Sequence, residues 1–228
     1  MMEGMAMRIV FIGDSVTEGC FELTNCGAGF EVIYDRENCY VAYLKQRLTR
    51  AFPEKNIEII NAGISGNTTG NGLERFDRDV LSLEPDVVVI CYGLNDGCSR
   101  DPKRFADTLT SMFDKLNVRK IPGVFMTPNM YNTYVHSEVL DCLVEMAEDC
   151  AACQNSGDMD AVMAAGITAA ENNGITVCDA YGVWKKLEEY GVDTTVLLSN
   201  KLNHPTRKMH KLFADMLYPI LLKEVAKK

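Results

Sequence analysis

Basic residues are fewer than acidic ones in this 228-residue chain, which has 23 Lys and Arg, 32 Asp and Glu, and a formal net charge of −9. An acidic chain is poorly suited to binding nucleic acid or an anionic membrane surface, because both carry negative charge themselves. Long apolar runs are also missing, and none is long enough to span a bilayer. The sequence therefore predicts neither nucleic acid nor membrane as a partner.

The first residues lack the features of a secretory leader. Residues 1–7 contain no basic n-region and no apolar h-region, and a predicted strand begins almost at once. The nine cysteines are odd in number, and Cys91, Cys142 and Cys178 fall in segments predicted to be buried, where a free thiol behaves as a small hydrophobe. We expect a cytoplasmic protein with reduced thiols, although the sequence leaves open a mature secreted form.

Five short apolar runs rich in β-branched residues alternate with amphipathic helical patterns. The runs span 7–12, 57–61, 86–91, 122–127 and 174–178. The helical patterns span 40–52, 70–83, 102–117 and a last segment from Pro205 to about Lys223. Near-continuous hydrophobicity is typical of strands covered on both faces. The alternation predicts one α/β domain over 1–228: a doubly wound, flavodoxin-like parallel sheet in order 2-1-3-4-5, with helices on both faces.

Two stretches are longer than ordinary connections between elements. Residues 20–39 follow the first turn, and residues 128–158 follow the fourth strand and include a predicted helix at about 136–153. Both leave the carboxyl ends of strands. We expect both to wall a substrate pocket, the alternative being surface elaboration without a role. The apolar stripe of 158–170, which includes Met159 and Met163, is expected to be core.

The tetrad Gly13-Asp14-Ser15-Val16 directly follows the first predicted strand. Open α/β sheets bind their ligands at that edge, so Ser15 is a candidate nucleophile, although Gly, Asp and Ser are also ordinary turn residues. Two further turns, 61–67 and 93–96, follow the next two strands and contain Gly66 and Asn95. The Gly66 N–H, the Asn95 carboxamide and the Ser15 N–H could converge as donors for an oxyanion, which acyl transfer requires.

Only three histidines, His136, His204 and His210, are available as a base. The predicted helices place His136 at the start of one helix and His210 inside the last one. Pro205 disfavours helical geometry at His204, so that imidazole should lie on the loop before the last helix. A histidine on a loop is usually just exposed, so the assignment of His204 as the base depends on the other motifs.

Taken together, these motifs resemble the SGNH hydrolases, also called the GDSL esterase/lipase family, over nearly the full chain. The family's first, second, third and fifth blocks match, in turn, residues 13–19, Gly66, residues 93–96 and His204-Pro205. The resemblance implies that Ser15 and His204 are catalytic. It also implies an oxyanion hole made by the N–H groups of Ser15 and Gly66 together with Asn95, and no metal or cofactor.

One position departs from the family pattern. The family usually carries Asp three residues before the histidine, and here that residue is Lys201, which cannot accept a hydrogen bond from Nδ1–H. We favour a Ser-His dyad in which a backbone carbonyl near 200–202 orients His204, because the other motif residues are retained. Asp179 is a possible third member, although it is better placed to cap a helix near 181–189. A weak or inactive relative is the third interpretation.

Family analogy, with the absence of an apolar lid motif, favours hydrolysis of short-chain acyl esters, O-acetyl groups on carbohydrates above all. The alternatives are a lysophospholipase or thioesterase-type acyl hydrolase, and a non-catalytic binding module motivated by Lys201. The expected partner is a small-molecule or carbohydrate ester, and the oligomeric state is not given by the sequence. Asp14 and Asp96 should hold their own turns. Cys150 and Cys153 resemble a zinc half-site or redox motif but lack a second pair, so we expect them to be structural.

Overall fold

A computed structural model of the chain describes residues 6–25, 27 and 29–228. Residues 1–5, the first part of the segment that lacks leader features, lie outside the described residues. Positions 26 and 28, which belong to the long 20–39 stretch and include Cys26, lie outside them as well.

The centre of the molecule is a sheet of five parallel strands. These strands are β1 (Met7–Gly13), β4 (Ile57–Gly63), β5 (Val87–Cys91), β6 (Gly123–Met126) and β7 (Thr176–Cys178). They lie in the order β4-β1-β5-β6-β7, and every neighbouring pair is parallel. When only the five strands of this sheet are numbered along the chain, the order is 2-1-3-4-5, as predicted. The strand labels run higher because the chain also forms a hairpin, β2–β3, that the sequence analysis did not predict.

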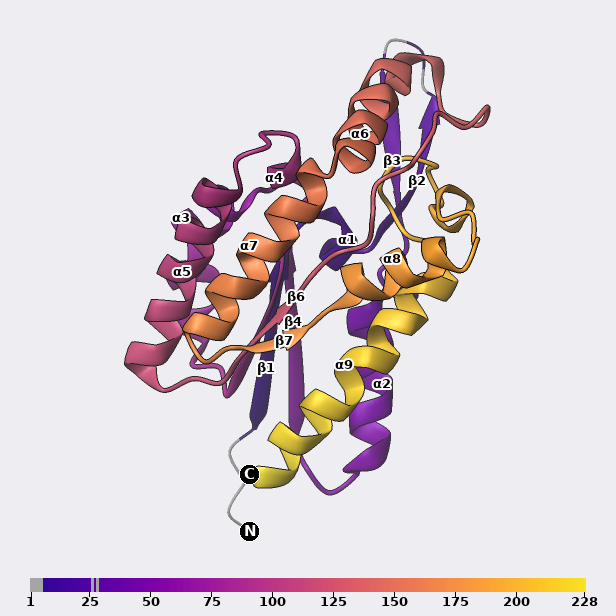
Figure 1. The fold of residues 1–228 in the computed structure, drawn as a ribbon. Coiled ribbons are helices and arrows are strands. Elements are labelled where there is room, and N and C mark those ends of the chain that lie inside the picture. The colour runs from indigo at the N-terminus through magenta and orange to yellow at the C-terminus, as the bar shows by residue number, and fades with distance from the viewer. Residues whose placement is uncertain (1–5, 26, 28) are drawn as a thin grey trace.

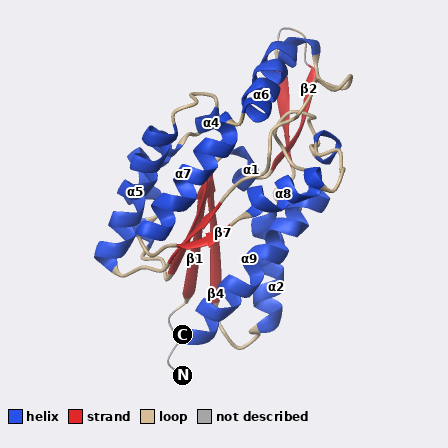
Figure 2. Cartoon of the chain, in the orientation of Figure 1, coloured by secondary structure: helices blue, strands red, loops and turns tan. Residues whose placement is uncertain are grey.

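Helices cover both faces of the sheet, which confirms the doubly wound α/β prediction (Figure 1; Figure 2). The helices around the sheet are α2 (Tyr40–Ala51), α3 (Thr69–Asp79), α5 (Pro102–Arg119), α7 (Asp158–Asn172), α8 (Ala180–Glu189) and α9 (Arg207–Lys227). Figure 1 shows α3, α5 and α7 on one side, while α2 and α9 pack together on the other. Across the described part of the chain, no helix is both long and apolar enough to cross a membrane.

Burial explains the apolar runs read from the sequence. Ile9 to Ile12 of β1 and Val88 to Ile90 of β5 have no exposed surface, because helices cover them from both sides. In α7, Met159 and Met163 are buried, which confirms their assignment to the core. About 25 cal/mol per Å² of buried apolar surface makes this layer the main stabilising contribution.

Two segments differ from the sequence predictions. Residues 20–39 are not one long loop, because β2 (Cys20–Asn25) and β3 (Phe30–Tyr34) form an antiparallel hairpin with Leu23 opposite Val32. The helix predicted from about 136 begins only at α6 (Val144–Ser156), after a 3-10 turn, η2 (Asp141–Leu143). The preceding chain is irregular: the Val139 N–H bonds the His136 carbonyl at 3.0 Å in a turn, and the Asn132 N–H bonds the Leu202 carbonyl at 2.9 Å.

The late start of α6 corrects two further expectations. His136 lies on a loop instead of at a helix start, and Cys142 is exposed instead of buried. The pattern over 70–83 is also divided, since α3 ends at Asp79 and a separate 3-10 turn, η1 (Leu81–Leu83), follows it. Cys91 and Cys178 are buried as predicted.

The hairpin and α6 project together beyond the carboxyl-terminal edge of the sheet (Figure 1). Together with η2, which leads into α6, we call these segments the arm: residues 20–25, 27, 29–34 and 141–156. The Cys142 thiol of η2 lies 3.9 Å from the Gly29 carbonyl of the hairpin, so the two parts of the arm touch. The arm stands next to the edge at which Ser15 lies.

Candidate active site

Ser15 is placed by the turn between β1 and the short helix α1 (Ser15–Glu18). Asp14 is the N-cap of this helix, and its carboxylate accepts the Val16 N–H at 3.0 Å, so it holds its own turn as predicted. Burial raises the pKa of Asp14 to about 7. As the first helical residue, Ser15 has a backbone N–H without an intrahelical partner. This N–H is therefore available to a ligand, while the hydroxyl meets a side chain from another element.

His204 reaches the Ser15 hydroxyl from the far end of the chain. Its Nε2 lies 3.0 Å from Ser15 Oγ, and its Nδ1 lies 3.1 Å from the backbone carbonyl of Phe21. A carbonyl only accepts, so Nδ1 carries the proton and Nε2 is left to accept the serine O–H. Burial lowers the pKa of His204 to about 4, against smaller opposing effects of the Phe21 carbonyl and the Glu22 carboxylate.

The carbonyl that binds Nδ1 comes from an unexpected place. A carbonyl near 200–202 was expected, but the acceptor belongs to Phe21 in the hairpin that was not predicted. Residue 200 contributes differently: the Asn200 side-chain oxygen accepts the N–H groups of Leu202, Asn203 and His204 at 2.9–3.1 Å. It thereby fixes the loop that presents the imidazole.

Lys201 stands where the family usually has aspartate, and Asp179 was the possible substitute. Both side chains contact groups other than His204. Lys201 has a left-handed φ of 58°, and its Nζ is 3.7 Å from the Glu138 carboxylate. Asp179 is the N-cap of α8, accepts the Gly182 N–H at 2.9 Å, and accepts the Thr127 hydroxyl at 3.0 Å. Its predicted capping role is thus confirmed, and the Nδ1 of His204 has the Phe21 carbonyl instead of a carboxylate.

Gly66 and Asn95 lie on the same cavity as Ser15 and His204. Gly66 has a φ of +76°, a conformation that glycine adopts without the cost of a side chain. Asn95, in the short helix α4 (Leu94–Gly97), donates one N–H to the Asn67 carbonyl at 2.9 Å. A carboxamide has two N–H bonds, so the second remains for a ligand.

The cavity has a volume of about 340 Å³, and its walls are mostly apolar. The apolar lining side chains are Leu23, Phe30, Val32, Leu143, Met146 and Leu202. All but Leu202 belong to the arm, so both long stretches, 20–39 and 128–158, supply walls of the cavity. The polar groups of Ser15, Gly66 and Asn95 follow the carboxyl ends of three strands, and we call this part of the cavity its floor.

The other two histidines lie elsewhere. His136 accepts the Glu138 N–H through Nδ1 at 3.1 Å on its loop. His210 is fully buried in α9, where Nδ1 accepts the Tyr40 N–H at 3.1 Å and burial lowers its pKa to about 3. Of the three histidines, His204 alone is paired with the serine.

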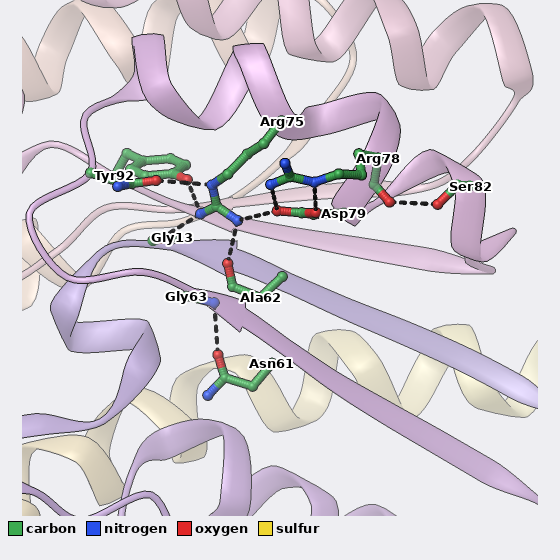
Figure 3. A network of polar contacts seen from close by, with 10 residues as sticks. Gly13, Asn61, Ala62, Gly63, Arg75, Arg78, Asp79, Ser82 and Tyr92 are labelled. Atoms are coloured by element: carbon green, nitrogen blue, oxygen red, sulfur yellow. Dashed lines mark hydrogen bonds and ion pairs between the residues drawn. The ribbon is translucent and has the colours of Figure 1, made fainter.

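A buried arginine that sequence reasoning missed, Arg75, joins the ends of three strands of the sheet (Figure 3). The Arg75 guanidinium donates to the carbonyls of Gly13 and Ala62 at 3.1 and 2.7 Å, and to the Tyr92 hydroxyl at 2.9 Å. These acceptors follow or end β1, β4 and β5, the strands that precede Ser15, Gly66 and Asn95. The sequence signal was weak: a charged residue next to the apolar face of a predicted helix.

Three further motif residues, Asp96, Cys150 and Cys153, also have specific places. Asp96 does not hold its own turn through its side chain, because its carboxylate accepts the N–H of Thr69, at the start of α3, at 3.0 Å. Cys150 and Cys153 line a small cavity of about 30 Å³ together with Cys98. Among residues 6–25, 27 and 29–228, no group of three or more His, Cys, Asp or Glu side chains is arranged to hold a metal ion.

Known proteins similar to this chain include an acetylxylan esterase of Geobacillus stearothermophilus, 35% identical over 102 residues that cover 41% of each chain. An arylesterase of Vibrio mimicus is 39% identical over 62 residues, which cover 27% of this chain and 30% of its own. The chain thus matches well under half the length of these curated relatives.

The fold is shared more completely than the sequence. The crystal structure of a lipase/acylhydrolase from Enterococcus faecalis has a TM-score of 0.69 at 22% identity, with 94% of both chains covered. The model of the GDSL-like lipase/acylhydrolase family matches residues 11–212, which include Ser15, Gly66, Asn95 and His204. The chain belongs to the GDSL-like lipase/acylhydrolase family.

Proposed function

We propose that the protein is a carboxylic ester hydrolase that uses Ser15 as nucleophile and His204 as base. The observation that carries the proposal is the contact between Ser15 Oγ and His204 Nε2 at 3.0 Å, made by a buried imidazole whose other nitrogen is held by a carbonyl. A nucleophile, a base and a group that orients the base are the parts that acyl transfer requires.

The geometry supports the following proton path. Ser15 attacks the ester carbonyl while its proton passes to Nε2 of His204, and the oxyanion accepts hydrogen bonds from the N–H groups of Ser15 and Gly66 and from Asn95. His204 then returns the proton to the leaving alcohol as the ester C–O bond breaks. A water molecule repeats the sequence on the acyl-serine, which releases the acid and restores Ser15.

The Phe21 carbonyl supports this role for an imidazole without a carboxylate partner. In a triad, replacing the carboxylate by an amide costs about four orders of magnitude because the amide selects the wrong histidine tautomer. A backbone carbonyl has no N–H to offer at its oxygen, so it selects the productive tautomer. The carbonyl carries no full charge, so it stabilises the imidazolium less than aspartate would.

For the substrate, we propose short-chain acyl esters, with O-acetyl groups on carbohydrates as the first class to test. The support is the similarity to the acetylxylan esterase, which covers less than half of either chain. A second candidate is a larger apolar acyl or aryl ester, as for a thioesterase- or lysophospholipase-type enzyme. The specific observation in its favour is the apolar wall of the cavity, which has more room than an acetyl group fills.

The experiment that tests the proposal compares wild type with Ser15→Ala on p-nitrophenyl acetate, together with labelling by an organophosphorus probe. We expect hydrolysis and stoichiometric labelling of Ser15 in the wild type, and neither in the variant at unchanged thermal stability. A folded wild-type protein that neither hydrolyses the ester nor reacts with the probe would show the alternative, a non-catalytic binding module.

A further inference from the structure

Arg207, at the first position of α9, stands three residues after His204 and forms a dense set of contacts with the hairpin. Its guanidinium bonds both oxygens of Glu22, at 2.5 and 3.2 Å, and one oxygen of Asp35 at 2.6 Å. The same group lies over the Phe21 ring, 4.3 Å from its centroid. One cation therefore joins α9 to β2 and to the residue that follows β3.

These contacts surround the carbonyl that orients His204. Phe21 is fully buried, with Arg207 against its ring and the His210 ring 4.6 Å away. The side chain of the next residue, Glu22, is held in a bidentate pair, which fixes geometry more firmly than a single contact. The backbone of residues 21 and 22 is thus held on both sides of the carbonyl that accepts Nδ1–H.

We propose that Arg207 is the positioning residue that takes over, through the Phe21 carbonyl, the orienting task that the aspartate at the Lys201 position performs elsewhere in the family. The inference rests on the proposed function of Ser15 and His204. Arg207 touches neither of these side chains in the described contacts, so it acts through β2. It also neutralises Glu22, whose charge otherwise favours the protonated imidazole.

The charged groups around His204 give the proposal a pH signature. Glu22 comes from β2, Asp35 from the end of β3, Arg207 and the buried His210 from α9, and Lys201 on the loop itself is paired with Glu138. Removing Arg207 leaves the Glu22 carboxylate, which acts on the imidazole, without its ion-pair partner, while Asp35 keeps its hydrogen bonds from Asn38. An unpaired negative charge raises the pKa of a histidine, so the base would become protonated at a higher pH.

The test uses Arg207→Met, which keeps an unbranched apolar chain against Phe21 but removes the charge. We expect kcat on p-nitrophenyl acetate to fall roughly ten- to a hundredfold with little change in KM, as for a displaced catalytic group. We expect the acidic limb of the kcat profile to move upward by about half a pH unit, a modest shift because Glu22 is half-exposed.

Arg47→Met is the matched control. Arg47 is also 38% exposed in its side chain, also pairs with a carboxylate, that of Asp215, and also lies over an aromatic ring, Tyr218, at 4.0 Å. These partners lie away from the cavity lining, so Arg47→Met should keep the wild-type kcat and pH profile. Equal kcat and equal acidic limbs in Arg47→Met and Arg207→Met would overturn the proposal.

Two more variants separate charge from geometry. Arg207→Lys keeps the charge but loses the two-pronged pair, so the acidic limb should stay in place while kcat recovers only in part. Glu22→Gln combined with Arg207→Met removes both charges, so the limb should return toward wild type while kcat stays low. If Arg207→Met does not fold, Arg207→Lys alone decides: full wild-type kcat contradicts the positioning role.

A measurement without substrate keeps the proposal distinct from the proposed function. NMR of ¹⁵N-labelled imidazoles reports the protonated nitrogen and the titration of His204 directly. Wild type should show a neutral ring with the proton on Nδ1, and Arg207→Met should weaken that signal and raise the titration midpoint. A wild-type protein without esterase activity would refute the proposed function, whereas unchanged imidazole signals in Arg207→Met would refute the role of Arg207.

Discussion

Asn95 has two tasks at the site, because one of its amide N–H bonds is already used. That bond, to the Asn67 carbonyl at 2.9 Å, holds the turn that contains Gly66. The second N–H points to no protein acceptor among the described contacts of Asn95. A single side chain therefore supplies one proposed oxyanion donor and supports the backbone that supplies another.

Replacing Asn95 by Ala should lower kcat by roughly 10²–10³ with little change in KM, as for the loss of one oxyanion donor. The interaction forms with the charge that develops in the transition state, so substrate binding itself should change little. Steady-state kinetics on p-nitrophenyl acetate would measure both constants. An effect confined to KM would make Asn95 a contact to the ground-state substrate instead.

The pH dependence of activity should follow the buried imidazole. Burial holds the pKa of His204 near 4, below the ordinary value of 6.5, so the base stays neutral as the pH falls through 6 and 5. We expect kcat/KM to hold its plateau into mildly acidic solution and to fall below it as one ionisation. A half-maximal point at or above pH 6.5 would contradict this assignment.

Asp179 offers the control for that interpretation. Asp179→Asn should change kcat only modestly, because the carboxylate caps α8 and binds Thr127, whereas His204→Ala should remove nearly all activity. If both variants are folded and equally damaged, the dyad of Ser15 and His204 is wrong and Asp179 acts on the base.

At the scale of elements, the arm forms most of the apolar wall of the cavity and so limits the size of the acyl group that can bind there. The floor is polar and built on strand ends, while the hairpin and α6 contribute apolar side chains such as Phe30 and Met146. The proposed preference for acetyl esters predicts that turnover falls steeply as the acyl chain lengthens. A series of p-nitrophenyl esters from acetyl to octanoyl would test it, and faster turnover of octanoyl esters would favour the larger apolar substrate.

A matched pair of variants would locate that preference in the arm. Met146→Ala widens the wall and should raise the relative rate on longer acyl chains, because Met146 lines the cavity. Val118 lies near the carboxyl end of α5, is 84% exposed and does not line the cavity. Val118→Ala should therefore leave the ratio of the rates on long and short acyl chains unchanged.

The sheet and its turns could be predicted from the sequence because their signals are local. The run that ends at Ser15 is apolar without a break, and both faces of β1 are indeed buried. The hairpin was not predicted, although Leu23 and Val32 face each other and glycines lie between its strands, because its two strands are short and lack a continuous apolar run. The partner of His204 could not be found, since any residue can offer the carbonyl that Phe21 offers.

For the whole molecule, stability should decline as the solution becomes acidic. Burial lowers the pKa of His204 to about 4 and that of His210 to about 3. Below pH 6.5 these two imidazoles therefore bind protons in the unfolded chain but stay neutral in the folded one. Each such group lowers the free energy of unfolding by about 1.4 kcal/mol per pH unit. Asp14 opposes this, because its folded pKa of about 7 favours proton binding by the folded state.

The two imidazoles outweigh Asp14, so we expect a net loss of stability as the pH falls from 6.5. Burial also raises the pKa of Asp96, which opposes the loss, whereas the lowered pKa values of Glu18, Asp35 and Asp79 add to it at the acidic end. Urea unfolding at several pH values would measure it, and Asp14→Asn, which removes the opposing contribution, should steepen the decline. A free energy of unfolding that stays level between pH 6.5 and 4.5 would show that the two imidazoles are not held neutral by burial.

The contact between Ser15 and His204 joins residues 189 positions apart, and His204 itself meets Phe21 across 183. During synthesis Ser15 leaves the ribosome long before His204 is made, and a domain generally folds as a unit. Nascent chains therefore carry the proposed nucleophile without the proposed base throughout most of translation. If Ser15 and His204 act as proposed, we expect hydrolysis only after residue 204 has been made and packed against Ser15, when nearly the whole chain has been synthesised.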